Sequence, residues 1–183
     1  MADTALIVID IQNDYFPGGA MQLEGADAAA ANAGKLVQKF RSEKLPIIHV
    51  RHLSVRPGAT FFLPGTKGAE IHAAVTPGAG EALITKHFPN GFRETNLLEA
   101  LRGAGASKLV ITGMMTHMCV DTTVRAAADL GFECRLAQDG CATRALQFSG
   151  QKVEAGQVQL AYLAALNGAF AKVESAEAIA AAL

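Results

Sequence analysis

The chain has 183 residues, 50% of them hydrophobic and 18% charged, so we expect one well-packed domain over 1–183 and not a disordered chain. A formal net charge of -1, the absence of Trp and the lack of an apolar run long enough to span a bilayer argue against nucleic acid and membrane as partners. Three cysteines are too few for a disulfide framework, which indicates free thiols and a cytoplasmic location.

Strand-like and helix-like stretches alternate along the whole chain. In chain order, the sequence predicts a strand over 4–10, a helix over 27–44 that Asp27 could cap, strands over 46–52 and 82–88, a helix over 95–105, a strand over 108–114, a helix over 119–131, a strand over 133–139, a helix over 153–169, a short strand over 170–173 and a helix over 175–183. Continuous apolarity in the strands indicates burial on both faces. The alternation therefore predicts an α/β fold, a three-layer doubly wound sandwich around a mostly parallel sheet of about six strands.

One long irregular stretch, 53–80, interrupts this alternation. A loop of that length inside a compact domain is usually functional or an oligomer contact. Its segment 59–75, ATFFLPGTKGAEIHAAV, is too apolar to lie in water as a loop. This segment therefore predicts a homo-oligomer.

Three reactive side chains lie where predicted strands end. Asp10 closes the first strand, Lys86 lies near the end of the third, and the fourth runs through Gly113 into the predicted helix that starts at Cys119. Singly, each has an ordinary explanation as a cap, a solvated cation or a small buried hydrophobe. Ligands bind beyond the carboxyl ends of parallel strands, however, so the three together predict a reactive site.

The position of Cys119 suggests how such a site would work. A helix N-terminus and a nearby ammonium both favour a thiolate, and the free N–H groups there can stabilise an oxyanion. A carboxylate can accept or return the proton. We therefore expect a lowered thiol pKa and nucleophilic chemistry shared by Cys119, Asp10 and Lys86.

The stretches ALIVIDIQNDYF, ITKHFPNGFRETNLLEAL and LVITGMMTHMCVDTTVRAAADLGF resemble the isochorismatase-like cysteine hydrolase superfamily over nearly the whole chain, most specifically in the G-x-x-T-x-x-C-V-x-x-T block at 113–123. The resemblance implies the strand order 3-2-1-4-5-6 and a dimer or tetramer. It also implies Asp10 as general base, Lys86 as the cation beside the thiolate and Cys119 as nucleophile. A non-proline cis peptide at Met114–Met115 is implied too, aiming the Met115 and Cys119 N–H groups at the oxyanion.

Two departures from the sequence patterns of this superfamily narrow the range of expected activities. The nicotinamidases of this superfamily carry Asp-x-His and a further His as metal ligands, but this region reads IIHVRHLSVRPG. His49 and His52 are three residues apart on a strand and point to opposite faces, so we expect neither a metal nor a nicotinamidase. Isochorismatases proper lack the nucleophilic cysteine. No other cofactor is expected.

The expected function is hydrolysis of a C–N bond in a small amide, ureide or cyclic amide through a thioester. A non-catalytic small-molecule-binding protein on the same fold and a redox-active thiol protein stay as alternatives, the latter weakened by the lack of a Cys-x-x-Cys pair. The sequence does not specify the substrate. The candidate substrate contacts are His87, His117, Phe16 and Phe92. Each of them could instead be an ordinary core or surface residue.

Overall fold

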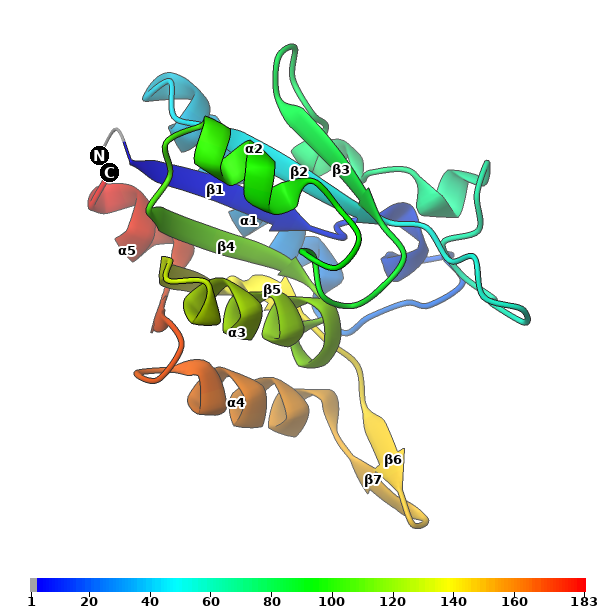
Figure 1. The fold of residues 1–183 in the computed structure, drawn as a ribbon. Helices are drawn as coiled ribbons and strands as arrows, with labels where there is room; N and C mark the ends of the chain where they lie inside the picture. The colour runs from blue at the N-terminus through cyan, green and yellow to red at the C-terminus, as the bar shows by residue number, and fades with distance from the viewer. Residues whose placement is uncertain (1–2) are drawn as a thin grey trace.

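A parallel sheet of six strands forms the middle of the molecule in this computed structural model, which describes residues 3–183 (Figure 1). Its strand order is β3-β2-β1-β4-β5-β8, and every neighbouring pair is parallel. Counted along the sheet strands alone, this is the predicted order 3-2-1-4-5-6. The strands are β1 (Thr4–Ile9), β2 (Ile47–His52), β3 (Ala82–Lys86), β4 (Lys108–Met114), β5 (Glu133–Ala142) and β8 (Lys172–Glu174).

Helices cover both faces of this sheet. One face carries α1 (Ala26–Ser42) and α5 (Ala176–Ala181), and the other carries α2 (Leu97–Gly103), α3 (Asp121–Asp129) and α4 (Ala155–Leu166) (Figure 1). In β1, Leu6 and Val8 pack on the α1 side, whereas Ile7 and Ile9 pack on the α2 and α3 side. Both faces of the strand are buried, which explains its unbroken apolar sequence. The predicted three-layer α/β sandwich is confirmed.

The boundaries of several elements differ from those predicted. Helix α1 begins after Gly25, whose φ of 74° places it in the left-handed region, so Asp27 lies in the first turn and is not the cap. Strand β5 extends three residues beyond the predicted end. The start predicted for α4 at Val153 was wrong, because this residue belongs to an antiparallel hairpin of β6 (Leu146–Phe148) and β7 (Gln151–Val153).

The apolar segment 59–75 packs against the chain's own core. Phe62 and Val75 are 0% and 1% exposed. The rings of Phe62 and Tyr15 meet edge to face with centroids 4.6 Å apart. Two short 3₁₀ turns, η2 (Lys67–Ala69) and η3 (Ala73–Val75), order the rest of the segment. Phe62, Ala69 and Val75 are thus covered within one chain, whereas Leu63 is 37% exposed, and the homo-oligomer inferred from this segment stays a prediction.

None of the helices in the described part of the chain is both long and apolar enough to cross a membrane.

Candidate active site

The carboxyl ends of β1, β3 and β4 meet at one edge of the sheet, where Asp10, Lys86 and Cys119 come together (Figure 1). Asp10 follows β1 with a φ of 50°, a conformation that residues other than glycine seldom adopt. Such backbone outliers cluster at functional sites. Gly113, near the end of β4, lies so close to β1 that a Cβ atom would collide with the Ile9 carbonyl oxygen. The glycine of the 113–123 motif thus brings the two strand ends together.

The Lys86 ammonium lies at the centre of the cluster. Its Nζ is 2.7 Å from Asp10 Oδ2 and 3.1 Å from Cys119 Sγ. Asp10 and Lys86 are both 0% exposed, and Cys119 is 6% exposed. Strand β3 is two places from β1, with β2 between them, and the long lysine side chain closes that distance. The structure therefore brings together all three residues that the strand ends suggested.

Burial and mutual attraction act in opposite directions on the pKa values of Asp10 and Lys86. Burial raises the pKa of Asp10, and the lysine charge offsets this only in part. Burial lowers the pKa of Lys86, but attraction to Asp10 and Cys119 outweighs it and the net direction is upward. The 2.7 Å contact joins a carboxylate to an ammonium, and the carboxylate is more basic than an ordinary aspartate.

The pKa of the Cys119 thiol differs from the sequence-based expectation. Burial and the Asp10 charge raise it above the ordinary value, and Lys86 offsets them only in part. Cys119 also lies inside a π-helical turn, η4 (Thr116–Val120), and α3 begins at Asp121 and not at Cys119. The lowered pKa expected from a helix N-terminus was therefore wrong. In the free protein the sulfur is a protonated thiol beside a basic carboxylate.

The turn between β4 and Cys119 is held by side chains from two neighbouring elements. The peptide bond between Met114 and Met115 is cis, at the position that the family resemblance implies. The hydroxyl of Thr116 donates to Gln159 Oε1 of α4 at 2.6 Å. The Gln159 amide donates in turn to the carbonyls of Gln138 and Cys141 in β5, at 3.3 and 3.2 Å. The turn is thus tied to both α4 and β5.

His52 is a member of the cluster that the sequence did not predict in this role. Its Nδ1 lies 3.0 Å from Lys86 Nζ. Burial, helped by the lysine charge, lowers the pKa of His52 to about 3, so the ring is neutral and accepts from the ammonium. Gln12 fixes the His52 backbone, donating to its carbonyl at 2.9 Å and accepting from its N–H at 2.7 Å. The signal for His52 that the sequence did contain was its place at the carboxyl end of β2.

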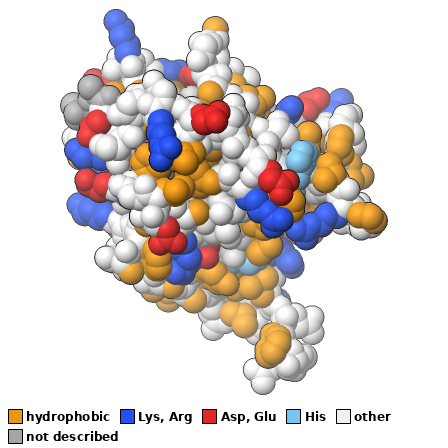
Figure 2. Space-filling model, viewed as in Figure 1, with side chains coloured by type: hydrophobic (Ala, Val, Ile, Leu, Met, Phe, Trp, Pro, Cys, Tyr) orange, Lys and Arg blue, Asp and Glu red, His pale blue; other side chains and the backbone are white. Residues whose placement is uncertain are grey.

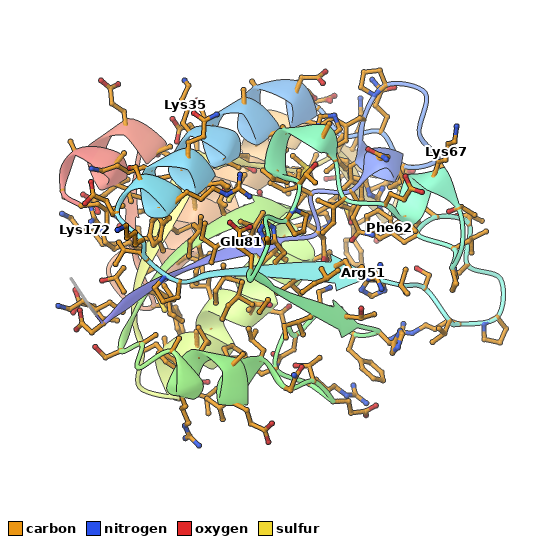
Figure 3. All side chains as sticks on the ribbon, turned by 90° about the horizontal axis from the view of Figure 1, so that it is seen from above. Lys35, Arg51, Phe62, Lys67, Glu81 and Lys172 are labelled. Carbon is orange, nitrogen blue, oxygen red and sulfur yellow. The ribbon has the colours of Figure 1, made fainter. Side chains whose placement is uncertain are left out.

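Asp14 and Tyr15, which were not predicted as site residues, join the segment 53–80 to this edge. The Asp14 carboxylate accepts from the backbone N–H of Phe62 at 2.6 Å and of Ala20 at 3.2 Å. A Cβ at position 68 would clash with that carboxylate, which explains Gly68. Burial, with Cys119 and Asp10 nearby, raises the pKa of Tyr15, so its phenol stays neutral. Figure 3 shows Phe62 and Arg51 at this end of the strands.

The cluster offers ligand atoms that a metal could use. One atom each from Asp10, His52 and Cys119 lies within 4.8 Å of the other two. However, the Lys86 ammonium stands within hydrogen-bonding distance of all three, so a cation placed there would meet a positive charge. His49 is bound elsewhere, with its Nε2 2.8 Å from Glu81 Oε2. These residues do not fit a metal site.

A pocket of about 330 Å³ opens beside the cluster. His52 and Met118, the neighbour of Cys119 in sequence, are two of its lining residues. Its remaining wall comes from the first part of the long segment and from the residues after β3. These lining residues are Ser54, Val55, Arg56, Pro57, Gly58, Ala59, Phe61, His87 and Pro89.

Of the four candidate substrate contacts, only His87 lines this pocket. Its Nδ1 lies 2.8 Å from the Leu53 carbonyl oxygen. The other three pack elsewhere. The Phe16 ring stacks on His72 at 3.7 Å, the Phe92 ring lies near Phe132 at 6.4 Å, and His117 Nδ1 lies 2.6 Å from Thr143 Oγ1.

Comparison with known proteins identifies the class to which this fold and cluster belong. Residues 4–177 match the isochorismatase domain, and the chain belongs to the isochorismatase family. The uncharacterized family protein YddQ of Bacillus subtilis is 48% identical over 96% of this chain and 97% of its own. A crystal structure of an isochorismatase-family protein from Oleispira antarctica superposes with a TM-score of 0.95, at 49% identity over 98% of this chain and 97% of the other.

Amide hydrolases occur among the more distant relatives. The nicotinamidase of Escherichia coli is 28% identical over 77% of this chain and 84% of its own length. A ureidoacrylate amidohydrolase of Variovorax paradoxus is also among these relatives, at 25% identity over 75% of this chain and 68% of its own length.

Proposed function

We propose that the protein is a cysteine-dependent hydrolase that cleaves the C–N bond of a small amide, ureide or cyclic amide through a thioester. The observation that carries this proposal is the meeting of Asp10, Lys86 and Cys119 beside a small pocket. A buried carboxylate and ammonium are costly in a core, and strongly perturbed groups of this kind cluster at functional sites.

The first half of the reaction uses the basic carboxylate and the thiol. The Cys119 sulfur attacks the substrate carbonyl carbon while the thiol proton passes to Asp10, so no free thiolate is needed in the resting protein. The backbone N–H groups of Met115 and Cys119 receive the developing oxyanion, and Lys86 keeps the attacking sulfur beside a positive charge. Collapse breaks the C–N bond, and Asp10 returns the proton to the leaving nitrogen.

The second half regenerates the enzyme. Water loses a proton to Asp10 as its oxygen attacks the thioester carbon. The C–S bond then breaks, the sulfur takes the proton back, and the carboxylic acid product leaves. Neutral His52 holds the Lys86 ammonium from the other side throughout, because its lone pair accepts from Nζ.

An ammonia-release screen over amides, ureides and cyclic amides tests this function. We expect the wild-type protein to release ammonia from at least one of them and the Cys119→Ala variant to release none. Equal release by both proteins, or none by the wild type across the whole screen, would contradict the proposal.

We further propose that the protein assembles as a homo-oligomer, a dimer or a tetramer. The β6–β7 hairpin projects from the body of the molecule, and an isolated two-stranded ribbon has little stability of its own (Figure 1). Phe148 of this hairpin is 82% exposed, and Leu160 of α4 is 70% exposed. Light scattering is expected to return a multiple of 19.1 kDa that falls in Phe148→Ser. A monomer mass for the wild type at micromolar concentration would refute it.

A further inference from the structure

The pocket beside Cys119 has an unbalanced charge. Arg56 is its only lining residue with a fixed charge, and no aspartate or glutamate among the described residues lines it. Within the part of the chain that the structure describes, the Arg56 guanidinium has no ion pair. An acidic side chain on the segment after β3, Glu94, is paired with Arg93 at 3.6 Å, and neither residue lines the pocket.

The inner end of the pocket does not supply the missing negative charge. The carboxylate of Asp10 is already paired with Lys86 at 2.7 Å. His52 is neutral and accepts from the same ammonium. Among the permanently charged side chains of the pocket and the cluster, Arg56 is therefore the one without an opposite charge paired to it. Figure 2 shows Lys and Arg side chains, with an acidic side chain among them, beside a histidine and hydrophobic groups at this end of the molecule.

The other lining residues are mostly apolar. Val55, Pro57 and Phe61 belong to the same segment as Arg56, Pro89 follows β3 and Met118 precedes Cys119, whereas Ser54 and His87 are polar. A volume of about 330 Å³ is at the small end of ligand sites. Such a space suits a short hydrocarbon spacer between two polar ends. One end would lie near Cys119 and the other near Arg56.

From this geometry we infer that the substrate is a small amide or ureide that carries a carboxylate, which Arg56 binds while the scissile carbonyl lies at Cys119. The guanidinium fork matches a carboxylate with two parallel hydrogen bonds, and this makes Arg56 a specificity-determining residue. A neutral amide would leave the charge of Arg56 unmatched, and a cationic amide would meet repulsion. The inference rests on the proposed function, because it takes Cys119 as the reacting atom.

Binding to the Cys119→Ala variant tests the inference without requiring turnover. Three primary amides of equal chain length differ only in their far end: succinamate is anionic, butyramide neutral and β-alaninamide cationic. Calorimetric titration is expected to give the tightest binding for succinamate, by about tenfold over butyramide, and no detectable binding for β-alaninamide. If succinamate binds best but no amide is hydrolysed by the wild type, the proposed function fails and the charge preference stands.

Second substitutions in that background locate the preference. Arg56→Gln is expected to bind succinamate about tenfold more weakly and butyramide unchanged, while Arg56→Lys keeps part of the preference. Arg102→Gln removes another exposed arginine, from α2 and outside the pocket, and is expected to change nothing. Butyramide or β-alaninamide binding as tightly as succinamate, no binding of succinamate at millimolar concentration, or an equal loss in Arg102→Gln would overturn the inference.

Discussion

The Lys86 ammonium lies 2.7 Å from the Asp10 carboxylate, and neither side chain is exposed to solvent. Removing one member of such a pair leaves an unpaired buried charge, at a cost of about 3–5 kcal/mol in folding free energy. A well-packed apolar pair of similar volume would hold the same strands together without that sensitivity. The pair is therefore better explained by its thiol neighbour, Cys119, than by stability.

The charges around the thiol predict opposite effects on its alkylation. Asp10→Asn removes the charge that raises the Cys119 pKa and leaves Lys86 unpaired. Iodoacetamide is therefore expected to alkylate Cys119 at least about tenfold faster at pH 7. Lys86→Met removes the offsetting cation and is expected to slow the reaction. The rate of alkylation is measured by mass spectrometry of the intact protein.

Cys119→Ala provides the background rate from the other two cysteines, Cys134 and Cys141, whose pKa values burial raises to about 12. Slower alkylation in Asp10→Asn than in the wild type would show that the carboxylate does not hold the thiol protonated.

Catalysis should depend on pH through Asp10. Because burial raises its pKa above the ordinary 3.8, the acid limb of kcat/KM is expected above that pH, with activity rising as the carboxylate ionises. Circular dichroism over the same range separates this titration from unfolding. An acid limb at or below pH 3.8 in folded protein would contradict the role of Asp10 as base.

Activity should not depend on a metal. Lys86 occupies the point that a cation would share with Asp10, His52 and Cys119. We expect elemental analysis of protein purified without added metal to find sub-stoichiometric zinc and iron, and EDTA to leave turnover unchanged. Stoichiometric metal that is lost in His52→Ala would refute this and favour a nicotinamidase-like site.

A second ionic cluster, far from the thiol, should affect stability and not turnover. Glu81 accepts from the Arg41 guanidinium at 2.6 and 2.9 Å and from the Gly78 N–H at 2.7 Å, near the start of β3 (Figure 3). These contacts lower its pKa from 4.5 to about 2, so the stability they provide is present above pH 4.5 and lost as pH falls toward 2.

Glu81→Gln is therefore expected to reduce the free energy of unfolding by about 2 kcal/mol at pH 7, measured in urea, and to flatten its acid dependence. Glu94→Gln, at an exposed pair, should cost under about 1 kcal/mol. Equal effects of the two substitutions would contradict the stabilising role assigned to the contacts of Glu81.

Three site residues could be predicted because each marks the carboxyl end of a strand or the turn after it. Asp10, Lys86 and Cys119 follow from strand periodicity, from the rule for open parallel sheets and from the family resemblance. The role of His52 could not be predicted in this way. Its charge state depends on burial under the segment 53–80, and no periodicity specifies how that segment folds.

The thiol pKa and the hairpin show two kinds of error. The expectation for Cys119 counted the helix and Lys86 but not the desolvation of a thiol that is 6% exposed. The hairpin had a local signal in the dipeptide Ser149–Gly150, which favours a tight turn and adopts positive φ in the structure, at 49° and 77°. The pattern of small apolar residues after Val153 obscured it.

The central claim is that Cys119 becomes acylated during turnover. Intact mass spectrometry of acid-quenched enzyme, mixed with an amide that it hydrolyses, measures this directly. We predict an added mass equal to the acyl group of the substrate, located on the peptide that contains Cys119 and absent in Cys119→Ala. Steady turnover in wild-type protein with no adduct at Cys119, together with continued ammonia release by Cys119→Ala, would contradict the account.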